Sequence, residues 1–173
     1  MEKRETRTAK IEQVGQGLFD FALEREDIKW LLGRFPREPA VKSATLEYEL
    51  QILKIVTVGW AIAYHLESHP WKMPLQEIYW QAMRDFSQTL SSTTELMIGQ
   101  DIDYFEVLKG RLDSYVAALE QQPKAPEPVQ VIGPAFAAEC GATDDLEISM
   151  TGSKIFASAL GQVKTYLAAL DLC

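Results

Sequence analysis

The chain has 173 residues, a hydrophobic content of 47% and a formal net charge of -8, from 17 Lys and Arg against 25 Asp and Glu. A chain of this length is expected to form one domain with a sizeable core, and its hydrophobic content excludes a disordered protein. The negative charge disfavours binding to nucleic acids and to anionic membranes, because both require a cationic surface. We therefore expect neither a nucleic-acid partner nor a membrane partner.

The two cysteines, Cys140 and Cys173, have neither metal-binding nor redox-motif spacing. The N-terminal sequence MEKRETRTAK lacks the apolar segment of a signal peptide. The longest apolar run, Ile55 to Leu66, is shorter than the ~20 residues that a membrane-spanning helix requires. These features predict a soluble, cytoplasmic protein in which both thiols are free.

Apolar residues at three- and four-residue intervals predict a first helix from about Thr8 to Leu32, ended by Gly33. Gly15 and Gly17 weaken its first half by about 1 kcal/mol each relative to alanine. The simpler interpretation of these glycines is lost helix propensity without a function, and the alternative is the close approach of another helix. An extended connector, residues 34–39, follows because it contains two prolines.

The second predicted helix, Leu46 to His69, is the most apolar in the chain, and it contains both histidines. On a helical wheel its polar residues share one narrow sector: Glu47, Gln51, Lys54, His65 and His69. Because most of the remaining surface is apolar, we expect this helix to be central and to contact other helices on three sides. Glu49 and Glu67 are exceptions that project onto the apolar side.

A third helix is predicted from Pro74 to about Met97, with Gly99 as its C-cap. A fourth helix follows Asp101 and carries an apolar stripe that ends at Leu119. Because the connection between them is short, we expect the third and fourth helices to pack as an antiparallel hairpin.

The C-terminal third begins with a proline-rich stretch, residues 123–134, which predicts an extended linker. We expect a short helix from Ala135 to Cys140, a weak strand signal at residues 146–150 and a last helix from Lys154 to about Leu172, capped by Ser153. The predicted fold is therefore all-α. It has a four-helix core in residues 1–122, a linker in 123–134, and helices in 135–173 that pack on the core within one domain.

His65 and His69 lie four residues apart, a spacing that places metal ligands on one face of a helix. Against a metal site, both histidines fall in the polar sector, His69 precedes a proline, and no Glu-x-x-His pair is present. The chain also lacks the glycine motifs of nucleotide-binding and hydrolase sites. Cys140 has no imidazole nearby in the sequence to activate it, so a packed thiol is expected. We predict no metal, no cofactor and no catalytic residue, and an enzyme is the less favoured class.

The aromatic residues indicate where a binding surface could form. Trp71 lies in a proline-flanked connector, and Trp80 lies beside the apolar stripe of the third helix rather than in its centre. Partly exposed tryptophans near charged groups are typical of protein interfaces. The predicted interaction surface consists of His65, His69, Trp71, Trp80 and Arg84.

These observations predict a helical protein–protein interaction module of the adaptor or protein-specific chaperone type, with a partner protein or with self-association, a homodimer being one option. The alternative is a ligand-binding or metal-binding bundle, or an enzyme, that uses Glu49 or Glu67 together with His65. Burial of either glutamate against a histidine or another acid favours this alternative.

Overall fold

The structure, a computed structural model, describes residues 2–35 and 41–173, and the regular elements in these ranges are all α-helices. The helices are α1 (Glu2–Leu23), α2 (Glu26–Leu32), α3 (Ser43–His65), α4 (Lys72–Ile98), α5 (Tyr104–Gln121), α6 (Val129–Glu139) and α7 (Leu146–Ala169). The all-α prediction is confirmed. The prolines of the connector predicted after the first helix, Pro36 and Pro39, lie outside the described residues.

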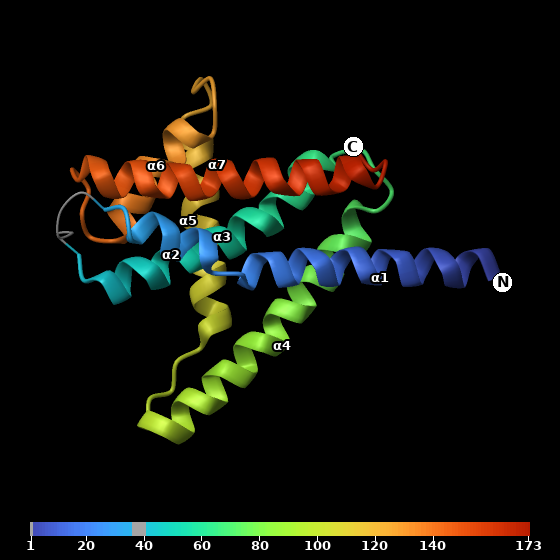
Figure 1. Cartoon of the computed structure of the whole chain (residues 1–173), viewed down its shortest axis with the longest axis horizontal. Coiled ribbons are helices and arrows are strands. Elements are labelled where there is room, and N and C mark those ends of the chain that lie inside the picture. Colours follow the sequence, from blue (N-terminus) through green and yellow to red (C-terminus); the bar gives the residue numbers. More distant parts are fainter. Residues whose placement is uncertain (1, 36–40) are drawn as a thin grey trace.

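Helix α3 is the centre of the fold and contacts each of the other six helices of the described chain. Figure 1 shows α7 running along one side of α3, while α1 and α4 lie on the other side. This position follows from the sequence of α3, in which residues 52–59 are all buried. A helix that is apolar around most of its circumference is stable only when neighbours cover it on several sides.

The predicted first helix is divided into α1 and α2 by a break at Glu24 and Arg25. No glycine or proline causes this break. Instead, the polar residues of α3 bind the carbonyl groups that the break releases, because Gln51 Nε2 donates to Ala22 O at 2.7 Å and Lys54 Nζ donates to Glu24 O at 2.8 Å. The orphan carbonyls at the end of α1 are thereby satisfied by side chains from another helix.

Lys54 is fully buried, although the wheel placed it in a polar sector. Its ammonium group also lies 2.9 Å from Asp27 Oδ2 and 4.4 Å from the centroid of the Phe21 ring. Near the start of the same sector, Glu47 Oε1 accepts a hydrogen bond from Arg25 at 2.6 Å. The polar stripe of α3 therefore binds the α1–α2 junction rather than facing solvent along its length.

The predicted extended linker, residues 123–134, is wrong in its second half, since α6 begins at Val129 and contains Pro134. Pro134 is exposed, and neighbouring apolar residues on the opposite side of α6 are buried against α7. The contact is close: a Cβ on Gly133 would lie 2.8 Å from the carbonyl oxygen of Ser149, and one on Gly152 would collide with Phe136. Tertiary burial thus outweighs the helix-breaking tendency of proline.

The weak strand signal at residues 146–150 is also wrong, because these residues form the first turns of α7. Asp145 is the N-cap, and its carboxylate accepts hydrogen bonds from the backbone N–H groups of Glu147 and Ile148 at 3.0 and 3.1 Å. Ser153, the predicted cap, lies inside α7 and donates to Val129 O of α6 at 3.4 Å. The capping aspartate decides the conformation here, since a short run of alternating residues carries little information.

Gly15 and Gly17 mark close helix contacts, the alternative that the sequence left open. A Cβ on Gly15 would lie 2.5 Å from Ile78 Cγ2 of α4, and one on Gly17 would lie 2.6 Å from the Tyr166 hydroxyl of α7. Helix α1 therefore packs closely on α4 at Gly15, and the Tyr166 side chain of α7 reaches α1 at Gly17.

We predict that Lys54→Met destabilises the protein by about 3 kcal/mol, because it leaves the Asp27 carboxylate and the Glu24 carbonyl without their buried cation. The free energy of unfolding is measured by urea denaturation. Lys29→Met is the control, since Lys29 forms an exposed ion pair with Glu26 and is expected to contribute less than about 1 kcal/mol. Equal effects of the two substitutions would contradict the role assigned to Lys54.

Candidate functional site

The two histidines lie at the α3–α4 turn and both are half-buried. His65 Nε2 lies 3.1 Å from the carbonyl oxygen of Leu160 in α7, to which it donates. His69 Nδ1 accepts a hydrogen bond from the backbone N–H of Trp71 at 3.1 Å. Each imidazole therefore has a local structural contact that helps to form the turn.

The other three residues of the predicted interaction surface divide between two places. Trp71 is half-buried at the α3–α4 turn, with the Lys10 ammonium 5.7 Å from its ring centroid. Trp80 packs on α3, where a Cβ on Gly59 would collide with its indole ring. The Arg84 guanidinium lies 4.8 Å from the ring centroid of Phe105 in α5. The structure thus separates Trp80 and Arg84 from the turn that carries Trp71 and both histidines.

The alternative polar site, Glu49 and Glu67 with His65, is not brought together. Glu49 is buried, whereas Glu67 is exposed just after the end of α3. Glu49 and His65 lie sixteen residues apart on one continuous helix, which corresponds to about 24 Å at 1.5 Å per residue.

Glu49 instead forms an ion-pair network between α3, α5 and α6. Arg111 donates to both carboxylate oxygens of Glu49, from Nε at 2.9 Å and from a terminal nitrogen at 2.8 Å. Its other terminal nitrogen lies 3.1 Å from Glu139, which also accepts a hydrogen bond from the Ser114 hydroxyl. A buried glutamate therefore does share a site with a second acid, the condition that favours an enzyme.

The surroundings of this network give it a structural role. The bidentate bond to Glu49 raises the pKa of Arg111, so this cation remains charged and compensates both acids. The hollow beside Tyr115 has a volume of only about 10 Å³, which is about the space of a single water molecule. Arg111 is thus paired with both acids, and the hollow nearest to it along α5 is too small for a substrate.

Cys140 lies close enough to this network for its charges to act on the thiol. Burial, together with the negative charge of Glu49, raises the pKa of Cys140 to about 12. A thiol with this pKa is almost completely protonated at neutral pH and is a poor nucleophile. This environment agrees with the prediction that Cys140 is a packed thiol.

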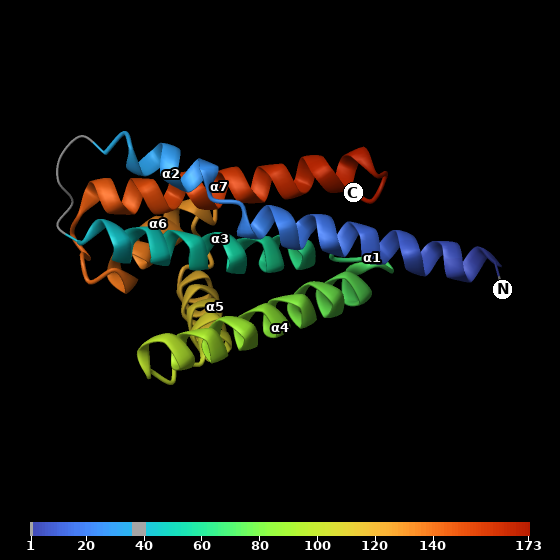
Figure 2. The ribbon, with the colours of Figure 1, turned by 60° about the horizontal axis from the view of Figure 1, so that its bottom comes forward.

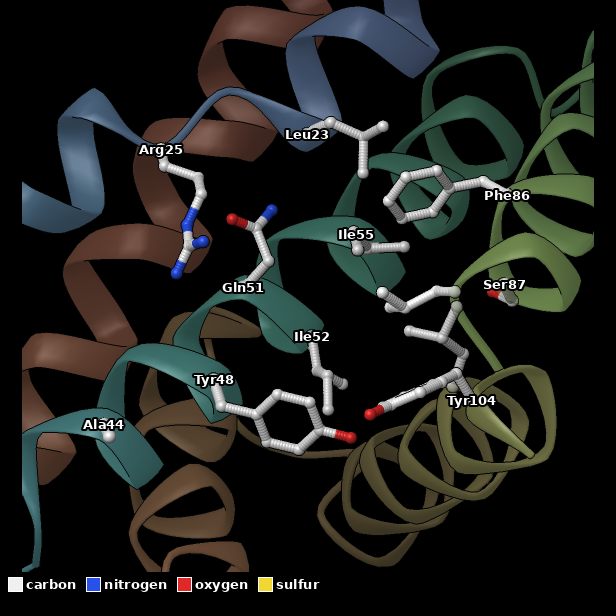
Figure 3. Close-up of a pocket in the computed structure, with 12 residues that line it drawn as sticks. Leu23, Arg25, Ala44, Tyr48, Gln51, Ile52, Ile55, Phe86, Ser87 and Tyr104 are labelled. Carbon is white, nitrogen blue, oxygen red and sulfur yellow. The ribbon is translucent and has the colours of Figure 1, made fainter. Parts of the chain in front are cut away.

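A larger pocket, of about 300 Å³, opens between the α1–α2 junction, α3, α4 and α5 (Figure 3). It is lined by Leu23, Arg25, Ala44, Tyr48, Gln51, Ile52, Ile55, Phe86, Ser87, Leu90, Tyr104 and Leu108. Most of these side chains are apolar, with a few polar groups among them. Such a combination is typical of binding sites for apolar or amphipathic ligands.

Two tyrosines form one side of the pocket, and Figure 3 shows their hydroxyl groups pointing toward each other. The rings of Tyr48 and Tyr104 meet edge to face with centroids 6.5 Å apart, and the Tyr104 hydroxyl lies 3.3 Å from Thr94 Oγ1. Partial burial and the nearby charge of Glu49 raise the pKa of Tyr48, so its hydroxyl is a hydrogen-bond donor at neutral pH. Gln51 Oε1 is buried and has no hydrogen-bond partner among the described residues.

The pocket is continuous with a part of the chain that projects from the remaining helices, which we call the arm (residues 85–108). Figures 1 and 2 show the second half of α4 leading away from α1, α3 and α7 before the chain returns as α5. The exposed fractions of Leu96, Met97 and Ile98 at its end are 88, 78 and 61%. Met97 lies on the apolar side of α4, and this side extends beyond the helices that cover its first half.

No protein-family model matches this chain, and neither a curated protein nor a solved structure matches it. Within the described residues, none of the helices combines the length and the hydropathy needed to cross a membrane. No group of three or more His, Cys, Asp and Glu residues in the described chain is arranged to hold a metal ion. Functional conclusions therefore rest on the site itself.

We predict that Arg111→Met lowers the free energy of unfolding by about 3 kcal/mol, because it leaves the buried Glu49 carboxylate unpaired. The double variant Glu49→Gln/Arg111→Met is expected to recover about 1 kcal/mol or more of this loss, since it removes the uncompensated charge. Urea denaturation measures both. Lys109→Met is the control on the same helix, because Lys109 forms an exposed pair with Glu106. A double variant less stable than Arg111→Met would contradict this account.

We also predict that iodoacetamide at pH 8 alkylates the exposed Cys173 and leaves Cys140 unmodified. With a pKa of about 12, roughly one Cys140 thiol in ten thousand is ionised at this pH, and the fraction rises tenfold with each pH unit. Peptide mass spectrometry over time gives both rates. Alkylation of Cys140 as fast as that of Cys173 in the folded protein would show that Cys140 is a reactive thiol.

Proposed function

We propose that the protein is a protein–protein interaction module whose docking surface is the α3–α4–α5 pocket together with the exposed apolar residues of the arm. The function class is the one that the sequence predicts. Its site differs from the predicted surface around the α3–α4 turn, where His65, His69 and Trp71 already contact neighbouring groups. The arm and the pocket offer apolar area that the fold leaves uncovered.

The observation that carries this proposal is the recurrence of exposed apolar groups on one side of α4, from the pocket to the end of the helix. Phe86 and Leu90 line the pocket, and each has an exposed fraction of 39%. Met97 continues the same side of α4 after two further turns, with an exposed fraction of 78%. Exposed apolar surface of this extent is costly in water and commonly marks a site that another molecule covers.

A small apolar ligand in the pocket is the second candidate function. The specific observation in its favour is the set of polar groups around an apolar interior, including the hydroxyls of Tyr48 and Tyr104. This candidate is the ligand-binding class that the sequence offered as its alternative, but at a site other than Glu49, Glu67 and His65. It explains the pocket but leaves Leu96, Met97 and Ile98 uncovered, so protein binding is favoured. A cytoplasmic setting suits either function, because both cysteines are free thiols.

The proposal is tested by placing a photo-cross-linking amino acid at Met97 of the full chain and irradiating living cells. We expect one discrete covalent adduct with a protein, and none when the same amino acid replaces the exposed Leu146 at the start of α7. The mass of the adduct distinguishes a second copy of the chain from another protein.

Two further variants connect the adduct to the pocket. Ala44 lies at the edge of the pocket and is exposed, so Ala44→Trp is expected to fill the pocket without disturbing the core, and to abolish the adduct. Ala157→Trp, at an exposed position on α7, is expected to leave it unchanged. An adduct of equal yield in both variants, or no adduct at Met97, would refute docking at this surface. Native mass spectrometry of a small-molecule adduct in that case would favour the second candidate.

A further inference from the structure

We infer that the partner segment which this docking surface fits is an amphipathic α-helix of about three turns with basic residues on its polar side. This inference rests on the proposed function, because it names the partner of the same surface. It is drawn from the length of the exposed apolar line, from the volume of the pocket and from the charge of the arm.

The length of the line fits a short helix. Phe86, Leu90 and Met97 are spaced by four and seven residues, so they share one side of α4. From Phe86 to Met97 the line covers eleven residues of a continuous helix, about 16 Å, which is the length of three helical turns. All regular elements of the described chain are helices, so it offers no sheet edge to which an extended segment could add a strand.

The pocket at the inner end of this line has room for more than one anchoring side chain. A cavity of about 150 Å³ holds a benzene molecule, so a pocket of about 300 Å³ holds on the order of two apolar side chains. Two such anchors come from neighbouring turns of one helix, at positions i and i+3 or i+4. Ile52, Ile55 and Leu108 supply apolar contacts inside the pocket.

The charge of the arm favours a basic partner. Arg25, the charged residue in the lining of the pocket, is paired with Glu47 at 2.6 Å and leaves the acidic residues of the arm unbalanced. The arm contains five acidic residues, Asp85, Glu95, Asp101, Asp103 and Glu106, and no Lys, Arg or His. With the flanking Arg84 and Lys109 included, five negative and two positive charges leave -3 over residues 84–109. Lysines and arginines beside the apolar anchors of a partner complement this charge and accelerate association.

The same charge argues against a second copy of the chain in a symmetric dimer through this surface. A two-fold axis would place each acidic arm beside its own copy, and like charges at an interface are unfavourable. Each chain as a whole also carries -8, which adds to the repulsion at low ionic strength. A different, basic protein is therefore the occupant that fits.

The test uses the full chain and two fluorescently labelled synthetic peptides of about fourteen residues with the apolar spacing of a helix. Binding is measured by fluorescence anisotropy. Both have leucines at positions 1, 4, 5, 8, 11 and 12, with lysines at the remaining positions of one and glutamates at those of the other. We expect the lysine peptide to bind at least about tenfold more tightly than the glutamate peptide, and to weaken as ionic strength rises to about 0.15 M.

The tryptophan variants show whether the peptide occupies the pocket. Ala44→Trp is expected to weaken binding of the lysine peptide about tenfold or more, whereas Ala157→Trp leaves it unchanged, with circular dichroism confirming that both variants are folded. Equal binding of the two peptides, or equal binding by both variants, would overturn the inference.

If the Met97 adduct forms but the lysine peptide does not bind at the pocket, the partner chemistry is wrong and the proposed function stands. If that adduct is absent, the proposed function itself fails.

Discussion

The buried ammonium group of Lys54 determines how the N-terminal third of the chain is arranged around α3. It binds the carbonyl oxygen of Glu24 in the α1–α2 break, the Asp27 carboxylate at the start of α2 and the face of the Phe21 ring. A lysine is buried in a protein interior only when several groups compensate its charge. Together with the bonds from Gln51 to Ala22 O and from Arg25 to Glu47, Lys54 holds the junction whose Leu23 and Arg25 form one wall of the pocket.

A second charged residue of α3 organises the opposite part of the chain in a similar way. Glu49 binds Arg111 of α5, which in turn binds Glu139 of α6. Hydrophobic contacts are not directional, so they do not by themselves select one rotation of a helix against another. The two buried charges of α3 provide that selection, because each must meet its counter-charge. Residues of α3 that line the pocket lie between Glu49 and Lys54 or beside them, and Tyr48 directly precedes Glu49.

Much of the fold could be predicted from local sequence, and the parts that could not are those that depend on distant partners. The apolar circumference of α3 identified the central helix, and Gly99, which has a φ of 66°, ended α4 as expected. The wheel correctly marked Glu49 as unusual, yet its partner Arg111 lies 62 residues further along the chain. Lys54 was placed in the polar sector without a partner for the same reason, since a helical wheel shows the direction of a side chain but not which residues lie there. Pro134 and residues 146–150 gave misleading local signals, because burial of α6 and the N-cap of α7 decided the conformation there.

The pocket had no sequence signature, because it is assembled from four separate segments.

Three threonines of α4 turn their hydroxyl groups back onto their own helix. Thr89, Thr93 and Thr94 donate their hydroxyl groups to carbonyl oxygens one turn earlier, at 3.1, 2.8 and 2.9 Å. Because these hydroxyl groups are bonded to the backbone of α4, the apolar residues are the main feature of the arm for recognition.

The arm also projects away from the side of the molecule where α1 begins and where α7 ends, as both ribbon views show (Figures 1 and 2). This separation has a practical consequence. A fusion partner, an affinity tag or a surface linker attached at either end of the chain would leave the arm directed outward and unobstructed. The molecule can therefore be immobilised or displayed through its termini in a single orientation, with its apolar projection presented to whatever is in solution.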